Sequence, residues 1–353
     1  MTDLEITTAG VLADRAQQLL DDHFGAPWPQ LLHNGHPTGD DVVFNYWWLA
    51  HVIDVRLDAY LRTGDQRSLE AAVATCRNIR ERNGGSLFND YFDDMLWYAL
   101  AILRLHHATG EPAYRDDAAA IWRHVVEHGW NDHVGPSLAW RKQQLDYKNT
   151  PANGPLVILS CRLAELLDDQ LYLDYARRSF GWLTETLVDP ATGFVEDGIN
   201  REQDGRIDTQ WRFTYNQGLY VGAAVELART AEDPDELIGR AIRTAATAIR
   251  ELAPDGVFGD EGDGDGGLFK GVYYRYLGLL LDRLDARSAA ATELRGFVID
   301  STDALIESTA GCTRLAGNDW RTPRSAKIKY STQLSAIMAL ELRARFGQDR
   351  RLT

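Results

Sequence analysis

Two adjacent carboxylates, Asp93 and Asp94, stand among aromatic residues in the segment NDYFDDMLWYA, residues 89–99. Such a pair suits glycoside hydrolysis, in which an ionised carboxylate attacks the anomeric carbon and a protonated carboxyl serves the leaving oxygen. Like charges close together push the two pKa values apart, as these roles require. Adjacent residues at a helix start meet the about 5–5.5 Å separation of a retaining pair more easily than the about 6.5–9.5 Å of an inverting pair.

A helix start is the simpler interpretation of these aspartates. With Asp90 as N-cap, Asp93 would be the third helical residue, where it would receive backbone N–H groups and a favourable helix dipole. The chain contains five Asp-Asp pairs, and the other four resemble caps, turns or solvated faces. The helix start accounts for Asp93, but it leaves unexplained the surrounding aromatic residues Tyr91, Phe92, Trp97 and Tyr98.

Three segments combine aromatic rings with hydrogen-bonding side chains: 135–155, 211–224 and 260–277. Aromatic rings stack on the apolar face of a pyranose, while amides, carboxylates and lysines bind its hydroxyls. We therefore predict a sugar-binding surface around Asp93. Its predicted substrate contacts are Tyr91, Trp140, Arg141, Lys142, Asn149, Tyr215, Asn216, Gln217, Asp265 and Phe269. Trp48, Trp122 and Trp182 are expected in the core.

Metal and cofactor motifs are missing from the sequence. Cys76, Cys161 and Cys312 lie far apart without zinc-type spacing, which indicates core residues in a reducing compartment. The segment DGDGG at 263–267 lacks the register and the downstream Glu of a calcium loop. We expect no metal and no cofactor.

The composition limits the class of partner. The chain has 353 residues and a net charge of −15, which disfavours nucleic acid and anionic membranes but leaves glycans and neutral or cationic small molecules open. No apolar segment of 18 residues occurs, and the first residues do not read as a signal peptide. These features predict a cytoplasmic protein with no membrane partner. The sequence does not fix the oligomeric state, for which a monomer is our expectation.

Helical periodicity dominates the chain, in repeated pairs of helices joined by short turns. The predicted turns lie at Thr63-Gly64-Asp65, Thr109-Gly110-Glu111, Asp168-Asp169, Glu232-Asp233 and near Asp285. A sixth pair joins residues 331–347 to an N-terminal helix at about 9–23. Six such hairpins predict an all-α, (α/α)6 barrel of about twelve helices, with no sheet larger than a small hairpin.

An open superhelical solenoid is the alternative architecture. Solenoid repeats usually keep one period, whereas these repeats vary in length, which favours the closed barrel. The long connectors are 24–42, 129–151, 189–212, 254–267 and 310–330, and none is a linker rich in Pro or Ser. We expect them to gather at one end and build the site, within a single catalytic domain over residues 1–353.

Four motifs in order resemble glycoside hydrolase family 76, the bacterial endo-α-1,6-mannanases. The paired-aspartate helix of that family appears as YFDDMLWYA at 91–99, and its W-R-K and K-N-x-x-x-N-G motifs appear at 140–142 and 148–154. Its T-Y-N-Q-G and F-K-G motifs appear at 214–218 and 269–271. The resemblance extends over roughly residues 40–340. It departs at Leu138-Ala139, which replaces a Gly-rich double-Trp stretch, and at Tyr98, which replaces a second Trp.

This resemblance implies an (α/α)6 barrel and a retaining hydrolase of α-1,6-linked mannan or manno-oligosaccharides. It makes Asp93 the nucleophile and Asp94 the general acid/base. We then expect local donors to hold Asp93 ionised near neutral pH, while the neighbouring charge and aromatic walls raise the pKa of Asp94. A transglycosylase, or another carbohydrate-active (α/α)6 enzyme such as a sugar epimerase, is the alternative.

Overall fold

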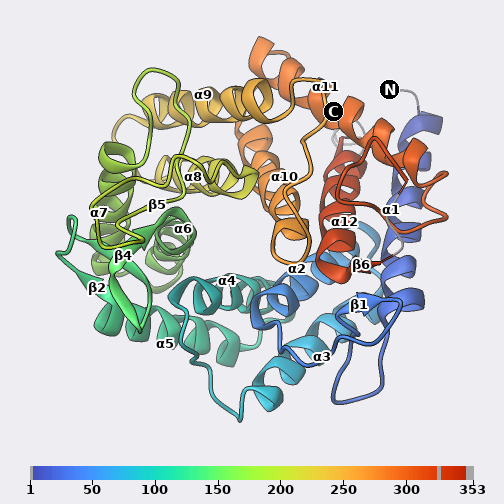
Figure 1. The fold of residues 1–353 in the computed structure, drawn as a ribbon, viewed down its shortest axis with the longest axis horizontal. Helices are drawn as coiled ribbons and strands as arrows, with labels where there is room; N and C mark the ends of the chain where they lie inside the picture. Colours follow the sequence, from blue (N-terminus) through green and yellow to red (C-terminus); the bar gives the residue numbers. More distant parts are fainter. Residues whose placement is uncertain (1–2, 324–326, 347–353) are drawn as a thin grey trace.

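The computed structural model describes residues 3–323 and 327–346, and these form two concentric rings of helices (Figure 1). The inner ring is α2 (Tyr46–Thr63), α4 (Phe92–Thr109), α6 (Thr150–Leu167), α8 (Thr214–Leu227), α10 (Gly266–Arg283) and α12 (Tyr330–Arg345). The outer ring is α1 (Asp3–Phe24), α3 (Gln66–Arg82), α5 (Pro112–Gly129), α7 (Gln170–Thr186), α9 (Pro234–Leu252) and α11 (Ala289–Ser308). Each inner helix packs against the next and α12 packs against α2, so the ring closes. The (α/α)6 prediction is confirmed, and the open solenoid is excluded.

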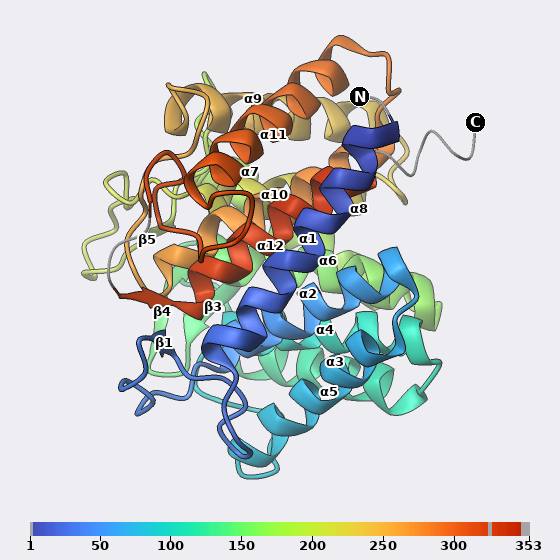
Figure 2. The same cartoon turned by 90° about the vertical axis from the view of Figure 1, so that its right-hand side faces the viewer.

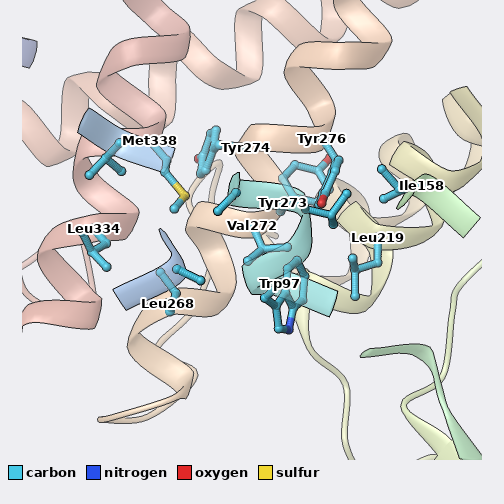
Figure 3. Close-up of a cluster of buried hydrophobic side chains, with 14 of the residues drawn as sticks. Trp97, Ile158, Leu219, Leu268, Val272, Tyr273, Tyr274, Tyr276, Leu334 and Met338 are labelled. Carbon is cyan, nitrogen blue, oxygen red and sulfur yellow. The ribbon is translucent and has the colours of Figure 1, made fainter. Parts of the chain in front are cut away.

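Burial separates the two rings. Nearly every residue of α8 and α12 is buried, whereas α9 buries one stripe that includes Ala241, Ala245 and Ala248. A helix surrounded by other helices is apolar on all sides, and an outer helix is amphipathic. Figure 3 shows side chains of α4, α8, α10 and α12, among them Trp97 and Leu219, meeting inside the barrel.

Two motif glycines allow the inner helices to approach closely. A Cβ on Gly218 would lie 2.6 Å from the Cα of Tyr273, and one on Gly271 would lie 2.8 Å from the Cα of Ser335. Both separations are far below normal van der Waals contact. These glycines therefore set the α8–α10 and α10–α12 spacing.

Short turns and long connectors alternate around the barrel. The predicted short turns are confirmed: α2 and α4 end at Gly64 and Gly110, both in the left-handed conformation that glycine adopts readily. The long connectors gather at the opposite end, toward the left of Figure 2. One boundary differs from prediction, since α1 begins at Asp3 rather than near residue 9. No helix in the described part of the chain is both long and apolar enough to cross a membrane.

The connectors contain more strand than we predicted. Strands β2 (Trp130–Asn131), β3 (Ser137–Arg141), β4 (Gln144–Asn149) and β5 (Gly198–Ile199) form a four-stranded antiparallel sheet. A second pair joins β1 (Gly35–His36) to β6 (Ile328–Lys329). The prediction of no sheet larger than a small hairpin is wrong. Burial along β3 and β4 changes from one end of each strand to the other instead of alternating, so period-two patterning does not reveal them.

Candidate active site

Helix α4 presents the paired aspartates at the connector end of the inner ring. The helix begins at Phe92, and its N-cap is Tyr91, which makes no side-chain capping bond. The prediction of Asp90 as N-cap is wrong, because Tyr91 is extended and bridges to Arg141 at the end of β3. Asp93 is consequently the second helical residue rather than the third.

The two carboxyl groups have different surroundings. Asp93 is 9% exposed; its Oδ1 accepts the backbone N–H of Asp94 at 2.9 Å, and its Oδ2 accepts the indole N–H of Trp140 at 3.0 Å. Asp94 is half-buried, and its Oδ2 accepts a longer bond of 3.4 Å from the amide of Asn89. Asp93 therefore has two close donors, and Asp94 has one distant donor.

Both carboxyl pKa values lie above the usual range. Burial raises the pKa of Asp93 and outweighs the hydrogen bonds from the Trp140 indole and from the backbone N–H groups of Asp94 and Asp93 itself, which lower it. Burial also raises the pKa of Asp94, and the charges of Asp93 and Asp265 raise it further. We expected local donors to hold Asp93 ionised, but desolvation acts on both groups. For Asp94 the upward direction and its cause, burial next to a second carboxylate, agree with our expectation.

Asp265 brings a third carboxylate to the site from the start of α10. Its Oδ1 accepts the indole N–H groups of Trp47 at 3.0 Å and Trp48 at 2.7 Å, both from α2. Trp48 is buried as predicted, and its hydrogen bond also fixes the position of Asp265. Sequence reasoning did not identify Trp47, because no spacing pattern links residues 218 positions apart.

Aromatic rings from several helix starts surround these carboxylates. Tyr215 and Phe269 stack with centroids 3.9 Å apart, and Phe269 stacks against Trp47 at 6.5 Å. Tyr91 meets Trp140 edge to face at 5.5 Å, and the guanidinium of Arg141 lies 4.5 Å from the Trp140 ring centroid. The structure therefore brings these predicted aromatic residues together around the aspartate pair.

Three other predicted substrate contacts make hydrogen bonds within the protein. Asn149 is buried and caps α6 by accepting the N–H of Ala152. Gln217 is buried and bonds both the N–H and the carbonyl of Val195, which fixes the connector between α7 and α8. Asn216 is also buried, and its amide nitrogen donates a hydrogen bond to Asp197 Oδ1. All three side chains are thus buried and bonded within the protein, whereas Asn216 Oδ1 has no hydrogen-bond partner among the described residues.

Lys142 lies at the turn between β3 and β4, where its backbone N–H donates to the carbonyl of Asp90 at 2.9 Å. This bond ties the sheet to the segment that precedes α4. Of the two departures from the family motifs, Tyr98 faces α3, with its hydroxyl 3.2 Å from Cys76 Sγ. Leu138 and Ala139 are fully buried in β3.

Sequence reasoning also missed Asp197, a buried carboxylate beside the site that binds several neighbouring side chains. It is 2% exposed, and its two oxygens accept bonds from Tyr147, Arg201, Tyr215 and Asn216. A single aspartate in an irregular connector has no local signature. Only its burial within the folded chain identifies it as the hub of four side chains.

Solved structures of similar proteins cover almost the whole chain. The Lin0763 protein from Listeria innocua is 45% identical, over 97% of this chain and 98% of that one, with a TM-score of 0.92. The GH76A alpha-1,6-mannanase from Salegentibacter sp. HEL1_6 is 34% identical, over 96% and 99%, with a TM-score of 0.89. An inactive variant of that mannanase, with two consecutive aspartates changed to asparagine, was solved in complex with alpha-1,6-mannotriose.

Curated relatives match over shorter stretches. The mannan endo-1,6-alpha-mannosidase DCW1 of Candida glabrata is 26% identical over 147 residues, which is 38% of this chain and 33% of that protein. A putative enzyme of the same name from Schizosaccharomyces pombe is matched over 47% of its length. The chain thus spans between a third and a half of these relatives. The model of glycosyl hydrolase family 76, in contrast, matches residues 12–346, and the chain belongs to that family.

Proposed function

We propose that this protein is a retaining glycoside hydrolase of α-1,6-linked mannan or manno-oligosaccharides, with Asp93 as nucleophile and Asp94 as general acid/base. The observation that carries the proposal is the unequal environment of the pair. Burial raises the pKa of both carboxyls, but close donors lower the pKa of Asp93, whereas the charge of Asp93 raises that of Asp94 further. Of the two groups, Asp93 is therefore the one that we expect to ionise first, while Asp94 keeps its proton. A retaining mechanism begins from this combination of protonation states.

The reaction follows in two displacements. The Asp93 carboxylate attacks the anomeric carbon, the bond from that carbon to the glycosidic oxygen breaks, and the Asp94 proton passes to the leaving oxygen. The Asp94 carboxylate then removes a proton from water, which attacks the anomeric carbon and releases Asp93. Each displacement inverts the anomeric centre, so the product retains the α configuration.

The position of the pair supports the assignment. Of the five Asp-Asp pairs, Asp93-Asp94 is the one that begins an inner helix at the connector end of the barrel. The 33% identical Salegentibacter mannanase is inactive when two consecutive aspartates are replaced. That variant binds an α-1,6-linked trisaccharide, which supports the same linkage here.

The test compares linkages. The protein is incubated with α-1,6-, α-1,2- and α-1,3-linked manno-oligosaccharides, and we expect the α-1,6 series alone to be shortened. Proton NMR of the first product should show the α-anomer before mutarotation. Shortening restricted to another linkage would contradict the proposed substrate, and a β-anomer formed first would contradict retention.

A further inference from the structure

Trp211 presents an exposed indole in the connector between α7 and α8. Its side chain is 39% exposed, and the Arg201 guanidinium carbon lies 3.8 Å from its ring centroid. The guanidinium therefore covers one face of the ring. The remaining exposed area of the indole offers an apolar surface on which a ligand can stack.

Arg201 is rigidly held beneath this ring. Its Nη2 donates to Asp197 Oδ2 at 2.8 Å, and its Nε donates to Asp208 Oδ2 at 3.0 Å, with both carboxylates buried. The guanidinium also lies 4.4 Å from the Tyr147 ring centroid. Fixing a surface aromatic before its ligand arrives reduces the entropy lost on binding.

The two carboxylates that hold Arg201 disfavour an anionic ligand on this platform. They offset the charge of Arg201 and occupy its Nε and one terminal nitrogen. An anion would meet Asp197 and Asp208 behind the guanidinium. A neutral ring with an apolar CH face, such as a hexopyranose, suits a flat indole supported in this way.

The platform is continuous with the catalytic pair. Arg201 lies 5.9 Å from the Trp140 ring centroid, and Trp140 donates to Asp93. The ring centroids of Trp211 and Phe213 lie 6.2 Å apart, and those of Phe213 and Phe269 lie 4.9 Å apart. Trp211 thus lies one side chain beyond the aromatic residues around Asp93.

We propose that Trp211 forms a distal sugar subsite, which stacks on a mannose unit of the substrate beyond the units that contact the catalytic pair. The inference rests on the proposed function and adds to it. It predicts that chains long enough to reach Trp211 are cleaved more efficiently than short ones.

Chain-length dependence tests this subsite. We would measure kcat/KM of wild type, Trp211→Ala, Trp211→Leu and Trp211→Phe on purified α-1,6-manno-oligosaccharides of two to six units. The alanine and leucine variants should lower the ratio of long-chain to short-chain kcat/KM by about three- to tenfold, the usual worth of one aromatic contact. Phenylalanine retains an aromatic face and should keep most of the ratio. Leucine retains bulk without the ring, so it serves if alanine impairs folding.

Trp28 supplies the matched control. It is 45% exposed and carries an arginine, Arg77, 5.1 Å from its ring centroid, but it lies over outer helix α3 beside a pocket of about 380 Å³. Trp28→Ala should leave the chain-length ratio at the wild-type value. If the ratio falls equally in Trp28→Ala, or does not fall in any Trp211 variant, the distal subsite is refuted while the proposed function stands. A wild-type protein that cleaves no α-1,6-linked chain overturns both.

Discussion

The indole N–H of Trp140 donates to Asp93 Oδ2 at 3.0 Å, across 47 positions of sequence. The bond joins strand β3 to the start of helix α4. It lowers the pKa of Asp93 against the effect of burial. The four-stranded sheet therefore acts on the ionisation of the proposed nucleophile.

Trp140→Phe should move the acid limb of kcat/KM to higher pH. The loss of this bond raises the pKa of Asp93, so the nucleophile is protonated at a pH where wild type is still active. A hydrogen bond to a charged group contributes about 1.5–3 kcal/mol, which corresponds to a shift of roughly one to two pH units. Trp122→Phe is the control, because its indole bonds Ser160 in the core; it should lower stability without moving the limb.

Asp265→Asn should move both the acid limb and the alkaline limb of the kcat/KM profile to lower pH. The charge of Asp265 raises the pKa of both Asp93 and Asp94, and its removal lowers both values. Asparagine keeps an oxygen that can accept the two indole N–H groups. Asp263→Asn, at an exposed position in the same connector, should leave the profile unchanged. An unshifted profile in Asp265→Asn would show that this third carboxylate does not act on the pair.

The roles of the two aspartates can be separated by azide. Asp93→Ala and Asp94→Asn should each lower turnover by several orders of magnitude. On a substrate with a good leaving group, azide should partly restore Asp94→Asn and yield an α-azide, because it attacks the glycosyl-enzyme without a general base. With Asp93→Ala, azide replaces the missing nucleophile and should yield a β-azide. An exchange of the two products would reverse the assignment.

The double variant Asp93→Asn/Asp94→Asn should be more stable than wild type at pH 8. Both folded-state pKa values lie above the unfolded values, so these carboxyls favour folding only while protonated, and that contribution is lost as pH rises through the folded pKa. Each unit of pKa difference corresponds to about 1.4 kcal/mol. We expect Tm to rise by roughly 2–4 °C or more.

The advantage should disappear near pH 3, where both carboxyls are protonated in either state. Asp189→Asn is the control of opposite sign, since backbone N–H groups of Ala191 and Thr192 lower the pKa of Asp189. That variant should lose stability at pH 8. A double variant less stable than wild type at pH 8 would mean that the pair stabilises the fold.

Gly218→Ala should destabilise the barrel, because its Cβ would lie 2.6 Å from the backbone of Tyr273. Overpacking of this kind costs about 1–3 kcal/mol. Gly239→Ala, in outer helix α9, has nothing within 4 Å of the new Cβ and should stabilise by about 0.5–1 kcal/mol. Denaturant unfolding of the two variants would measure the contrast. Equal effects would refute the packing role of Gly218.

Local signals predict the barrel well. Helical periodicity and the glycines at positions 64 and 110 define the hairpins, because turn chemistry and amphipathic stripes lie within a few residues of one another. The aspartate pair is also visible locally, since both carboxylates begin one helix. Tyr215 and Phe269 are identifiable as aromatic residues beside connectors, although their stacking is not.

Contacts between distant connectors are beyond local signals. Asn149 and Gln217 have the residue types of sugar ligands, but only the folded chain shows that backbone groups occupy their amides. Asp197 and Trp47 contribute to the site through hydrogen bonds to partners that no sequence spacing predicts. Burial, which raises the pKa of Asp93, is likewise a property of the assembled ring.

Closure of the ring sets a time at which the protein can finish folding. The contact between α12 and α2 includes the hydrogen bond from Arg62 to Glu341, across 279 positions. Helix α2 therefore cannot make this contact until nearly the entire chain has been synthesised. At a synthesis rate of about 5–20 residues per second, that interval is on the order of tens of seconds. During it, apolar inner faces of the early helices lack their final neighbours, and a chaperone would protect them from aggregation. The hydrogen bond from Trp48 to Asp265 also joins residues that are synthesised far apart in time, so the site forms late in synthesis.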